Sequence, residues 1–164
     1  TLKGTITSVS NTSYGNFYLN DGTGEVLIYG LVGPNGEQKY WATSGAKVGD
    51  DITVKTIRTE YNKAPQGKNA TFVEVKSPGT LAFWSFKATS ASFTAAADAK
   101  DIEVNIYNST ADVVATSDNA QFSATYANGV LTVSALENTS SDPIEGNITV
   151  TCGTLSHVIT VSQL

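Results

Sequence analysis

The stretch FYLNDGTGEVLIYGL, residues Phe17–Leu31, decides the fold class of the first half of the chain. Two runs of β-forming residues flank an Asp-Gly-Thr-Gly segment, which tolerates the positive φ angles of a tight hairpin connection. Because side chains alternate along a strand, each run has one face for the core and one for solvent. We predict a buried set and an outward set: Phe17, Leu19, Val26 and Ile28 inside, with Tyr18, Leu27 and Tyr29 outside.

The sequence around this hairpin predicts further strands and one short helix. Residues 37–46, EQKYWATSGA, offer about two helical turns, with Gly45 as the expected stop. Along residues 50–61, the alternation of apolar residues shifts by one position after Val54. This shift predicts a bulge near Lys55–Thr56. Residues 63–69, KAPQGKN, read as a loop. Two other segments alternate as strands, residues 2–9 and 70–75.

Three strands, a short helix and two strands follow one another in the order of the OB-fold, a five-stranded Greek-key barrel. The motifs GTITSV, YGNFYLNDGTGEVLIYG and KVGDDITV resemble OB-fold modules in surface and secreted proteins of Bacteroidetes. The resemblance covers about the first 76 residues. It implies a barrel whose second and third strands form a ligand-binding face.

The second half of the chain predicts only strands. Asn128-Gly129 lies between two β-forming runs, and a second hairpin is expected about Gly153. Several short strands at this spacing are typical of a β-sandwich. The ending LENTSSDPIEGNITVTCGTLSHVITVSQL resembles the BACON domain, an Ig-like family of Bacteroidetes that is associated with carbohydrate binding. The matching residues are Asn138, Gly146, Ile148, Val150, Val161 and Gln163.

Charge is distributed unevenly between the two halves. Up to Ser77 there are eight Lys and Arg against seven Asp and Glu, and from Pro78 onward two against eight. The halves therefore carry +1 and −6, which sum to the −5 of the chain. This shift coincides with the Pro-Gly pair of residues 76–80, KSPGT. We predict a barrel domain over residues 1–77 and a sandwich domain over residues 78–164.

The sequence shows no catalytic apparatus, metal site or cofactor motif, and we predict that the protein is not an enzyme. Its one cysteine, Cys152, is expected to be a buried small hydrophobe, and its one histidine, His157, a packed or edge residue. Asp50 and Asp51 are expected at a solvated strand start. Asp21 is expected in an Asx-type turn.

The strongest candidate for function is a surface of the barrel. Outward aromatic and apolar side chains there have cations near them, as a binding face for a strand of nucleic acid or sugar would. The candidate binding residues are Tyr18, Leu27, Tyr29, Tyr61, Lys55, Arg58, Lys63 and Lys68. The net charge of this half is only +1, which favours a glycan or protein partner over nucleic acid.

Three functions remain open at this point. The preferred one is a non-catalytic binding or spacer module of a bacterial cell-surface protein, with a glycan or protein as partner. The alternatives are single-stranded nucleic-acid binding by the barrel, and a purely structural spacer. The resemblances imply export to the cell surface, the periplasm or the medium. No apolar run could span a bilayer, and an export signal or lipid anchor is expected upstream of Thr1.

Overall fold

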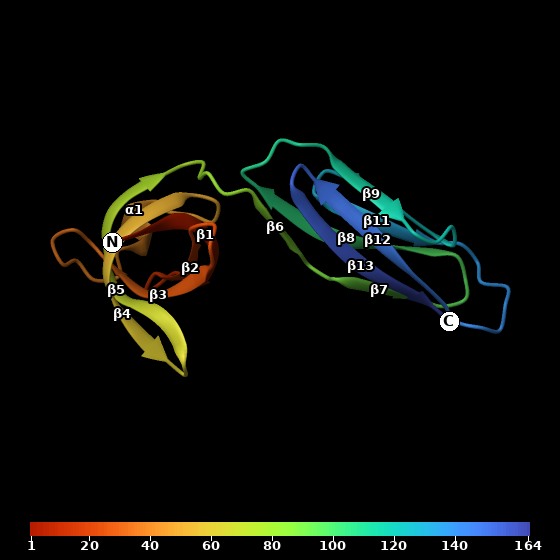
Figure 1. Cartoon of the computed structure of the whole chain (residues 1–164), viewed down its shortest axis with the longest axis horizontal. Helices are drawn as coiled ribbons and strands as arrows, with labels where there is room; N and C mark the ends of the chain where they lie inside the picture. Colours follow the sequence, from red (N-terminus) through yellow and green to blue (C-terminus); the bar gives the residue numbers. More distant parts are fainter. The chain divides into compact units, whose positions relative to one another are not determined.

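The computed structural model describes all residues from Thr1 to Leu164, and the chain forms two compact units. The first unit spans Thr1–Leu81 and the second Ala82–Leu164 (Figure 1). The division thus falls four residues after the boundary expected at Ser77. The reason is that Gly79 and Thr80 are hydrogen-bonded to the first unit, through Gly49 and Asp51.

The first unit is a closed barrel with strand order β1-β2-β3-β5-β4. One short helix lies between the third and fourth strands, which is the OB-fold arrangement. The elements are β1 (Leu2–Asn11), β2 (Asn16–Asn20), β3 (Glu25–Val32), α1 (Trp41–Ser44), β4 (Asp51–Tyr61) and β5 (Ala64–Lys76).

The barrel interior is filled by the side chains that alternation places inside. Phe17, Leu19 and Ile28 are buried as predicted, and Val26 is half-buried against the same core. The helix α1 is one turn long and therefore shorter than expected, because residues 38–40 form a turn. It ends at Gly45 in the left-handed conformation (φ 68°), as predicted. Its Trp41 ring packs on Phe17, with 5.3 Å between ring centroids.

The segment expected to be a loop, residues 63–69, belongs almost entirely to β5, so this prediction was wrong. β4 and β5 form a long antiparallel hairpin that turns at Asn62 and Lys63, both with positive φ. Pro65 and Gly67 led to the prediction of a loop, because both residues usually interrupt strands. Figure 1 shows the end of this hairpin projecting from the barrel.

An irregularity lies near Lys55–Thr56 as expected, but the extra residue is in the partner strand. Between the pairs Lys55–Thr71 and Ile57–Lys68, β4 advances two residues and β5 three. Asn69, with φ 49°, lies in this stretch of β5. β4 itself keeps alternating, so the apolar phase change has another cause: Ile57 and Tyr61 are exposed on the outer face.

The expectation that Asp50 and Asp51 are solvated was wrong, since both are buried. The Asp50 carboxylate accepts a hydrogen bond from the Lys47 amide at 3.1 Å. Asp51 accepts from the Thr5 hydroxyl and from the amide and hydroxyl of Thr80, the last two at 3.1 and 2.9 Å. Their burial is possible because polar groups from the neighbouring segments satisfy the carboxylates.

The second unit is a β-sandwich of two four-stranded sheets, with orders β10-β11-β8-β6 and β7-β13-β12-β9. Both predicted hairpins are present, one turning at Asn128-Gly129 and the other at Gly153. The elements are β6 (Phe83–Phe86), β7 (Ser90–Phe93), β8 (Asp98–Tyr107), β9 (Val113–Ser117), β10 (Phe122–Ala127), β11 (Val130–Ala135), β12 (Ile144–Cys152) and β13 (Leu155–Gln163).

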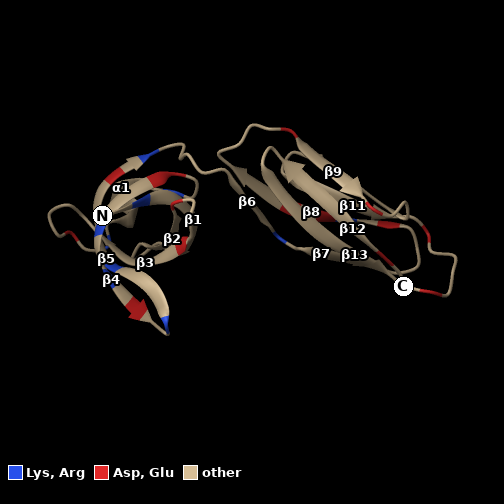
Figure 2. Cartoon of the chain, viewed as in Figure 1, with Lys and Arg blue, Asp and Glu red and all other residues tan.

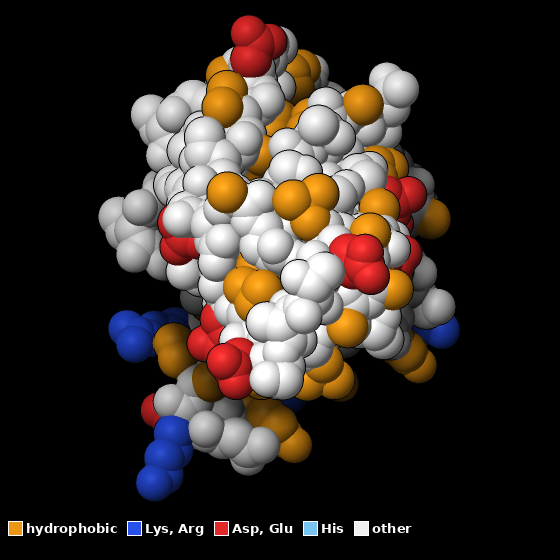
Figure 3. All heavy atoms as spheres, turned by 90° about the vertical axis from the view of Figure 1, so that its right-hand side faces the viewer, with side chains coloured by type: hydrophobic (Ala, Val, Ile, Leu, Met, Phe, Trp, Pro, Cys, Tyr) orange, Lys and Arg blue, Asp and Glu red, His pale blue; other side chains and the backbone are white.

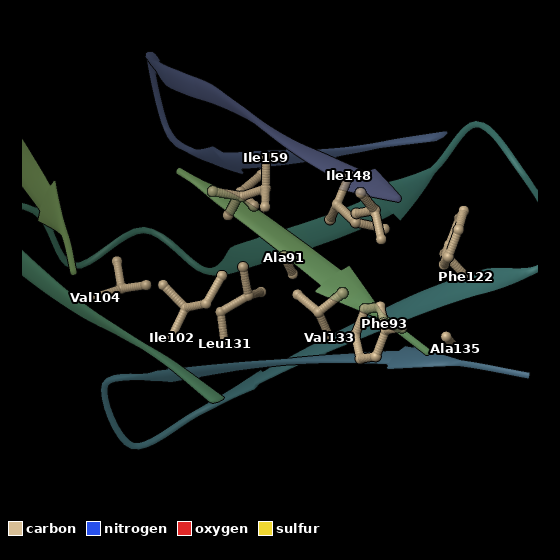
Figure 4. Packing of buried hydrophobic residues seen from close by; sticks show 12 residues of the cluster. Ala91, Phe93, Ile102, Val104, Phe122, Leu131, Val133, Ala135, Ile148 and Ile159 are labelled. Carbon is tan, nitrogen blue, oxygen red and sulfur yellow. The ribbon is translucent and has the colours of Figure 1, made fainter. Parts of the chain in front are cut away.

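The sandwich core lies between the two sheets, where their inward side chains meet (Figure 4). Phe93 and Phe122 pack there with 6.4 Å between ring centroids. Ile102 and Leu131 come from one sheet and Ile159 from the other. The fold class predicted from the sequence is therefore confirmed: an all-β chain with one short helix, a five-stranded barrel and a following sandwich.

Candidate functional site

The outer face of β2, β3, β5 and β4 carries two rows of side chains that cross the strands. In the first row, Tyr18 lies opposite Leu27, Leu27 opposite Gln66, and Gln66 opposite Thr59. In the second row, Tyr29 lies opposite Lys68 and Lys68 opposite Ile57. Side chains directly opposite each other on one face of a sheet are in contact range. These rows, together with Tyr61 at the end of β4, are called the outer face below.

The outer face exposes large apolar side chains. Ile57 is 77% exposed, Tyr61 67% and Tyr29 50%, whereas Tyr18 and Leu27 are half-buried. Ile57 and Tyr61 lie on the projecting hairpin of Figure 1. A single exposed apolar residue is ordinary, but neighbouring ones on adjacent strands form a patch of the kind that marks an interaction surface.

The four candidate cations are distributed over different parts of the hairpin. Lys68 lies within the outer face, and Lys55 points to the same side of β4 as Ile57. Lys63 lies at the hairpin tip. Arg58 is opposite Gly67, which is paired with the buried Ile28, so its side chain points to the inner side of the sheet. The structure therefore places Lys68 opposite Tyr29, Lys55 on the same side of the sheet, and Arg58 on the other side.

Arg58 instead lines a cleft at the open end of the barrel. The cleft has a volume of about 340 Å³ and runs between the start of β1, the β2–β3 turn and the β4–β5 hairpin. Its lining includes the apolar Leu2, Leu19 and Val26 and the polar Arg58 and Gln66. It is called the mouth cleft below.

The β2–β3 turn at the rim of the mouth cleft is held by its own polar groups. The Asp21 carboxylate accepts from the Thr23 hydroxyl at 2.6 Å and from the Thr23 amide at 2.9 Å, which is the Asx-type turn that was expected. These hydrogen bonds lower the pKa of Asp21 below its usual value. The carboxylate is thus engaged in local structure.

The residues of the sandwich that match the BACON ending have structural roles. Ile148, Val150 and Val161 are in the core. Gln163 is buried, and its side-chain amide donates to the carbonyl of Leu136 at 2.7 Å and to that of Thr94 at 3.0 Å. These residues contribute to the core and to the hydrogen bonds that hold the end of the sandwich.

The sandwich surface has a polar hollow rather than an aromatic platform. A hollow of about 630 Å³ is lined by residues of β7, β12 and β13, among them Ser92, Asn147 and Thr160, with no aromatic side chain. Asp118, at its edge, accepts from the amide and the side chain of Asn147. Figure 3 shows scattered apolar side chains among polar ones on the face it presents.

Cys152 is buried as predicted, 3.3 Å from the carbonyl of Ala111. His157 is half-buried and stacks on Phe86, with 4.4 Å between ring centroids. Nowhere in the chain do three or more His, Cys, Asp or Glu side chains gather as ligands of a metal ion would.

Comparison with protein-family models, with curated proteins and with solved structures found no match for this chain. None of its helices has the length and apolar character needed to cross a membrane. The candidate site therefore rests on the geometry of the outer face. Sequence reasoning overlooked Ile57 and Gln66 as members of this face. The signal for Ile57 was present in the phase change along residues 50–61, which was interpreted as a bulge alone.

Proposed function

We propose that the chain is a non-catalytic binding module and that it binds a protein or glycan partner through the outer face of its barrel. One observation carries the proposal: Tyr29, Ile57 and Tyr61 are half-exposed or more on a single sheet face. Tyrosine offers a flat apolar ring with a polar tip, which suits both protein and sugar surfaces. The aliphatic Ile57 favours a protein, because an aliphatic side chain has no ring on which a sugar could stack.

In this proposal the module belongs to an exported bacterial cell-surface protein, and the sandwich is a carrier or spacer. The export is supported by the resemblance of both halves to modules of Bacteroidetes surface proteins. The spacer role is supported by the structural use of the residues that match the BACON ending. The barrel is then the part of the chain that recognises the partner.

The proposal is tested by screening the full chain against a glycan array and a displayed peptide library. We expect wild-type protein to select ligands in one of the two, and the triple variant Tyr29→Ala, Ile57→Ala, Tyr61→Ala to lose them. The matched control is Tyr14→Ala, because Tyr14 is also 54% exposed but lies in the connection between β1 and β2. Ligands that the triple variant retains in full would contradict the assignment of the face.

A further inference from the structure

One edge of β4 lacks a strand partner over more than half of its length. β1 pairs with β4 only from Asp51 to Val54, so the stretch Lys55–Tyr61 is paired with β5 alone. No other backbone hydrogen bond reaches this stretch. Figure 1 shows the end of the hairpin that contains it projecting from the barrel. An unpaired edge of this kind is a template for another strand, and the stretch is called the free edge below.

Pro65 shows which backbone groups face the free edge. The pairs of an antiparallel ladder alternate between those that exchange two N–H···O=C hydrogen bonds and those that exchange none. Glu60 lies opposite Pro65, which has no N–H, so this pair is of the second kind. The same holds two residues along, where Arg58 lies opposite Gly67. The N–H and C=O groups of Arg58 and Glu60 therefore point away from β5, toward the free edge.

The free edge is complementary to a second copy of itself. If two copies pair antiparallel about Thr59, Arg58 lies opposite the Glu60 of the other copy, and Ile57 lies opposite its Tyr61. The outward backbone groups of Arg58 and Glu60 then meet, so the hydrogen bonds fit this register. Opposite charges, a β-branched residue facing an aromatic one, and two facing threonines all stabilise antiparallel strands. Every position from Ile57 to Tyr61 therefore faces a favourable partner.

The two charges select both the occupant and the register. Arg58 and Glu60 are exposed, and neither side chain has a hydrogen-bond or ion-pair partner within the chain. A purely acidic or purely basic strand would satisfy only one of them. Moving the centre of pairing by one residue would bring Arg58 opposite Arg58, or Glu60 opposite Glu60, which is unfavourable. We propose that two copies of the chain pair through their free edges, centred on Thr59, to form a two-fold symmetric dimer.

Such a dimer has a consequence for the barrel surface. The interface uses the same stretch of both copies, as two-fold symmetry requires. The two barrel sheets become continuous across the interface, and side chains opposite each other in a ladder lie on the same face. The outer faces of both copies therefore join into one surface, in which each Ile57 lies beside the Tyr61 of the other copy.

The test measures sedimentation of the full chain over a range of concentrations. We expect a monomer–dimer equilibrium in wild type. Arg58→Glu and Glu60→Arg should each weaken the dimer about tenfold or more, because both attractive charge pairs become repulsive. The double variant restores opposite charges at both pairs and should regain the dimer. Lys87→Glu, which makes the same change of net charge as Arg58→Glu at an exposed position of the sandwich, is the control and should leave the dimer intact.

Mixing the two single variants tests the register. In a mixed dimer, both carboxylates of one copy face both cations of the other, so the mixture should dimerise although neither variant does so alone. Hydrogen exchange tests the backbone pairing: the amides of Arg58 and Glu60 should exchange more slowly as the wild-type concentration rises. The proposal is overturned if wild type stays monomeric at millimolar concentration. It is also overturned if neither the double variant nor the mixture dimerises, or if the concentration-dependent protection lies outside residues 57–61.

This inference concerns the edge of β4, whereas the proposed function concerns the outer face, so each can fail alone. Tyr29→Ala changes the outer face on β3 and should leave the dimer intact. Arg58→Glu keeps every tyrosine and Ile57 and should still select the outer-face ligand as a monomer. Loss of the dimer in Tyr29→Ala, with Arg58→Glu still dimeric, would transfer the interface to the outer face and refute the edge.

Discussion

At the scale of single residues, a few buried polar side chains hold segments that the hydrophobic core cannot reach. The Asp51 carboxylate joins Thr5 of β1 to Thr80 beyond β5. Gly79 makes this contact possible, because a Cβ there would lie 2.6 Å from an Asp51 carboxylate oxygen and from the Gly49 carbonyl oxygen. In the sandwich, Gln163 plays a comparable part by donating to the carbonyls of Thr94 and Leu136.

Replacing Asp51 with Ala should destabilise the barrel by about 2–3 kcal/mol, because the buried hydroxyl of Thr5 and the amide of Thr80 lose their acceptor. Trp41 is the only tryptophan of the barrel, so in a Trp84→Phe background its fluorescence during urea unfolding reports on this unit. The control is Asp112→Ala, which removes an exposed acid from the sandwich. An unfolding curve of the Asp51 variant that coincides with that of wild type would contradict the role of the carboxylate.

The pKa of Asp51 gives this contact a pH dependence. Burial alone would raise the pKa, but hydrogen bonds from Thr5 and Thr80 and the charge of Lys3 hold it below the ordinary value. A lowered pKa in the folded state stabilises the barrel above the unfolded value of about 3.9, and this contribution is lost as the pH falls through the folded pKa. Acid titrations should therefore show the stability difference between wild type and Asp51→Ala shrinking below about pH 4. A difference that grows toward low pH would have the wrong sign.

At the scale of elements, the β4–β5 hairpin links the fold to the proposed functions. Its inner side chains near the barrel are buried, its outer ones form part of the candidate face, and one of its edges is free. Its turn places both Asn62 and Lys63 at positive φ, as in the two-residue turns that suit twisted hairpins. Lys63 adopts this conformation at a cost that glycine would not have.

We therefore expect Lys63→Gly to stabilise the hairpin, by about 0.5–1 kcal/mol. Hydrogen exchange of the amides of residues 57–68 measures this directly. Lys68→Gly is the contrasting change, since Lys68 lies within β5 and glycine weakens a strand interior. Faster exchange in Lys63→Gly than in wild type would show that the turn does not limit the hairpin.

Sequence patterns predicted the elements whose side chains alternate between core and solvent, and missed those in which other forces dominate. The Phe17–Leu31 hairpin was readable because its apolar residues face the core. The strand that contains Pro65 and Gly67 could not be predicted in this way, since its extended conformation depends on pairing with β3 and β4. The burial of Asp50 and Asp51 depends on distant donors such as Thr80. That Arg58 lies on the inner side of the sheet could be predicted only with knowledge of the register of β4 against β5.

At the scale of the whole molecule, the two units differ in charge. The barrel unit, Thr1–Leu81, carries +1, and the sandwich unit, Ala82–Leu164, carries −6. Figure 2 shows acidic residues along the sandwich and residues of both charges on the barrel. Nucleic-acid affinity comes largely from contacts between cations and phosphates, so this balance opposes the alternative function.

We expect no measurable binding of single-stranded DNA at physiological salt. Fluorescent oligonucleotides titrated against the full chain test this over a range of salt concentrations. If Lys55, Arg58, Lys63 and Lys68 did contact phosphates, four contacts would give a log–log salt slope of about −3. Micromolar binding with that slope, abolished by Tyr18→Ala with Tyr29→Ala, would replace our proposal with nucleic-acid recognition.

The central claim is that the barrel recognises the partner and that the sandwich serves as a carrier or spacer. The most direct test screens three forms of the full chain side by side on the same glycan array and peptide library. These are wild type, the outer-face triple variant, and a sandwich variant, Val114→Ser with Val158→Ser, which changes two exposed apolar residues of that unit. We predict that wild type and the sandwich variant select the same ligands and that the outer-face variant selects none. Loss of the ligands by the sandwich variant, with the outer-face variant unaffected, would contradict the account.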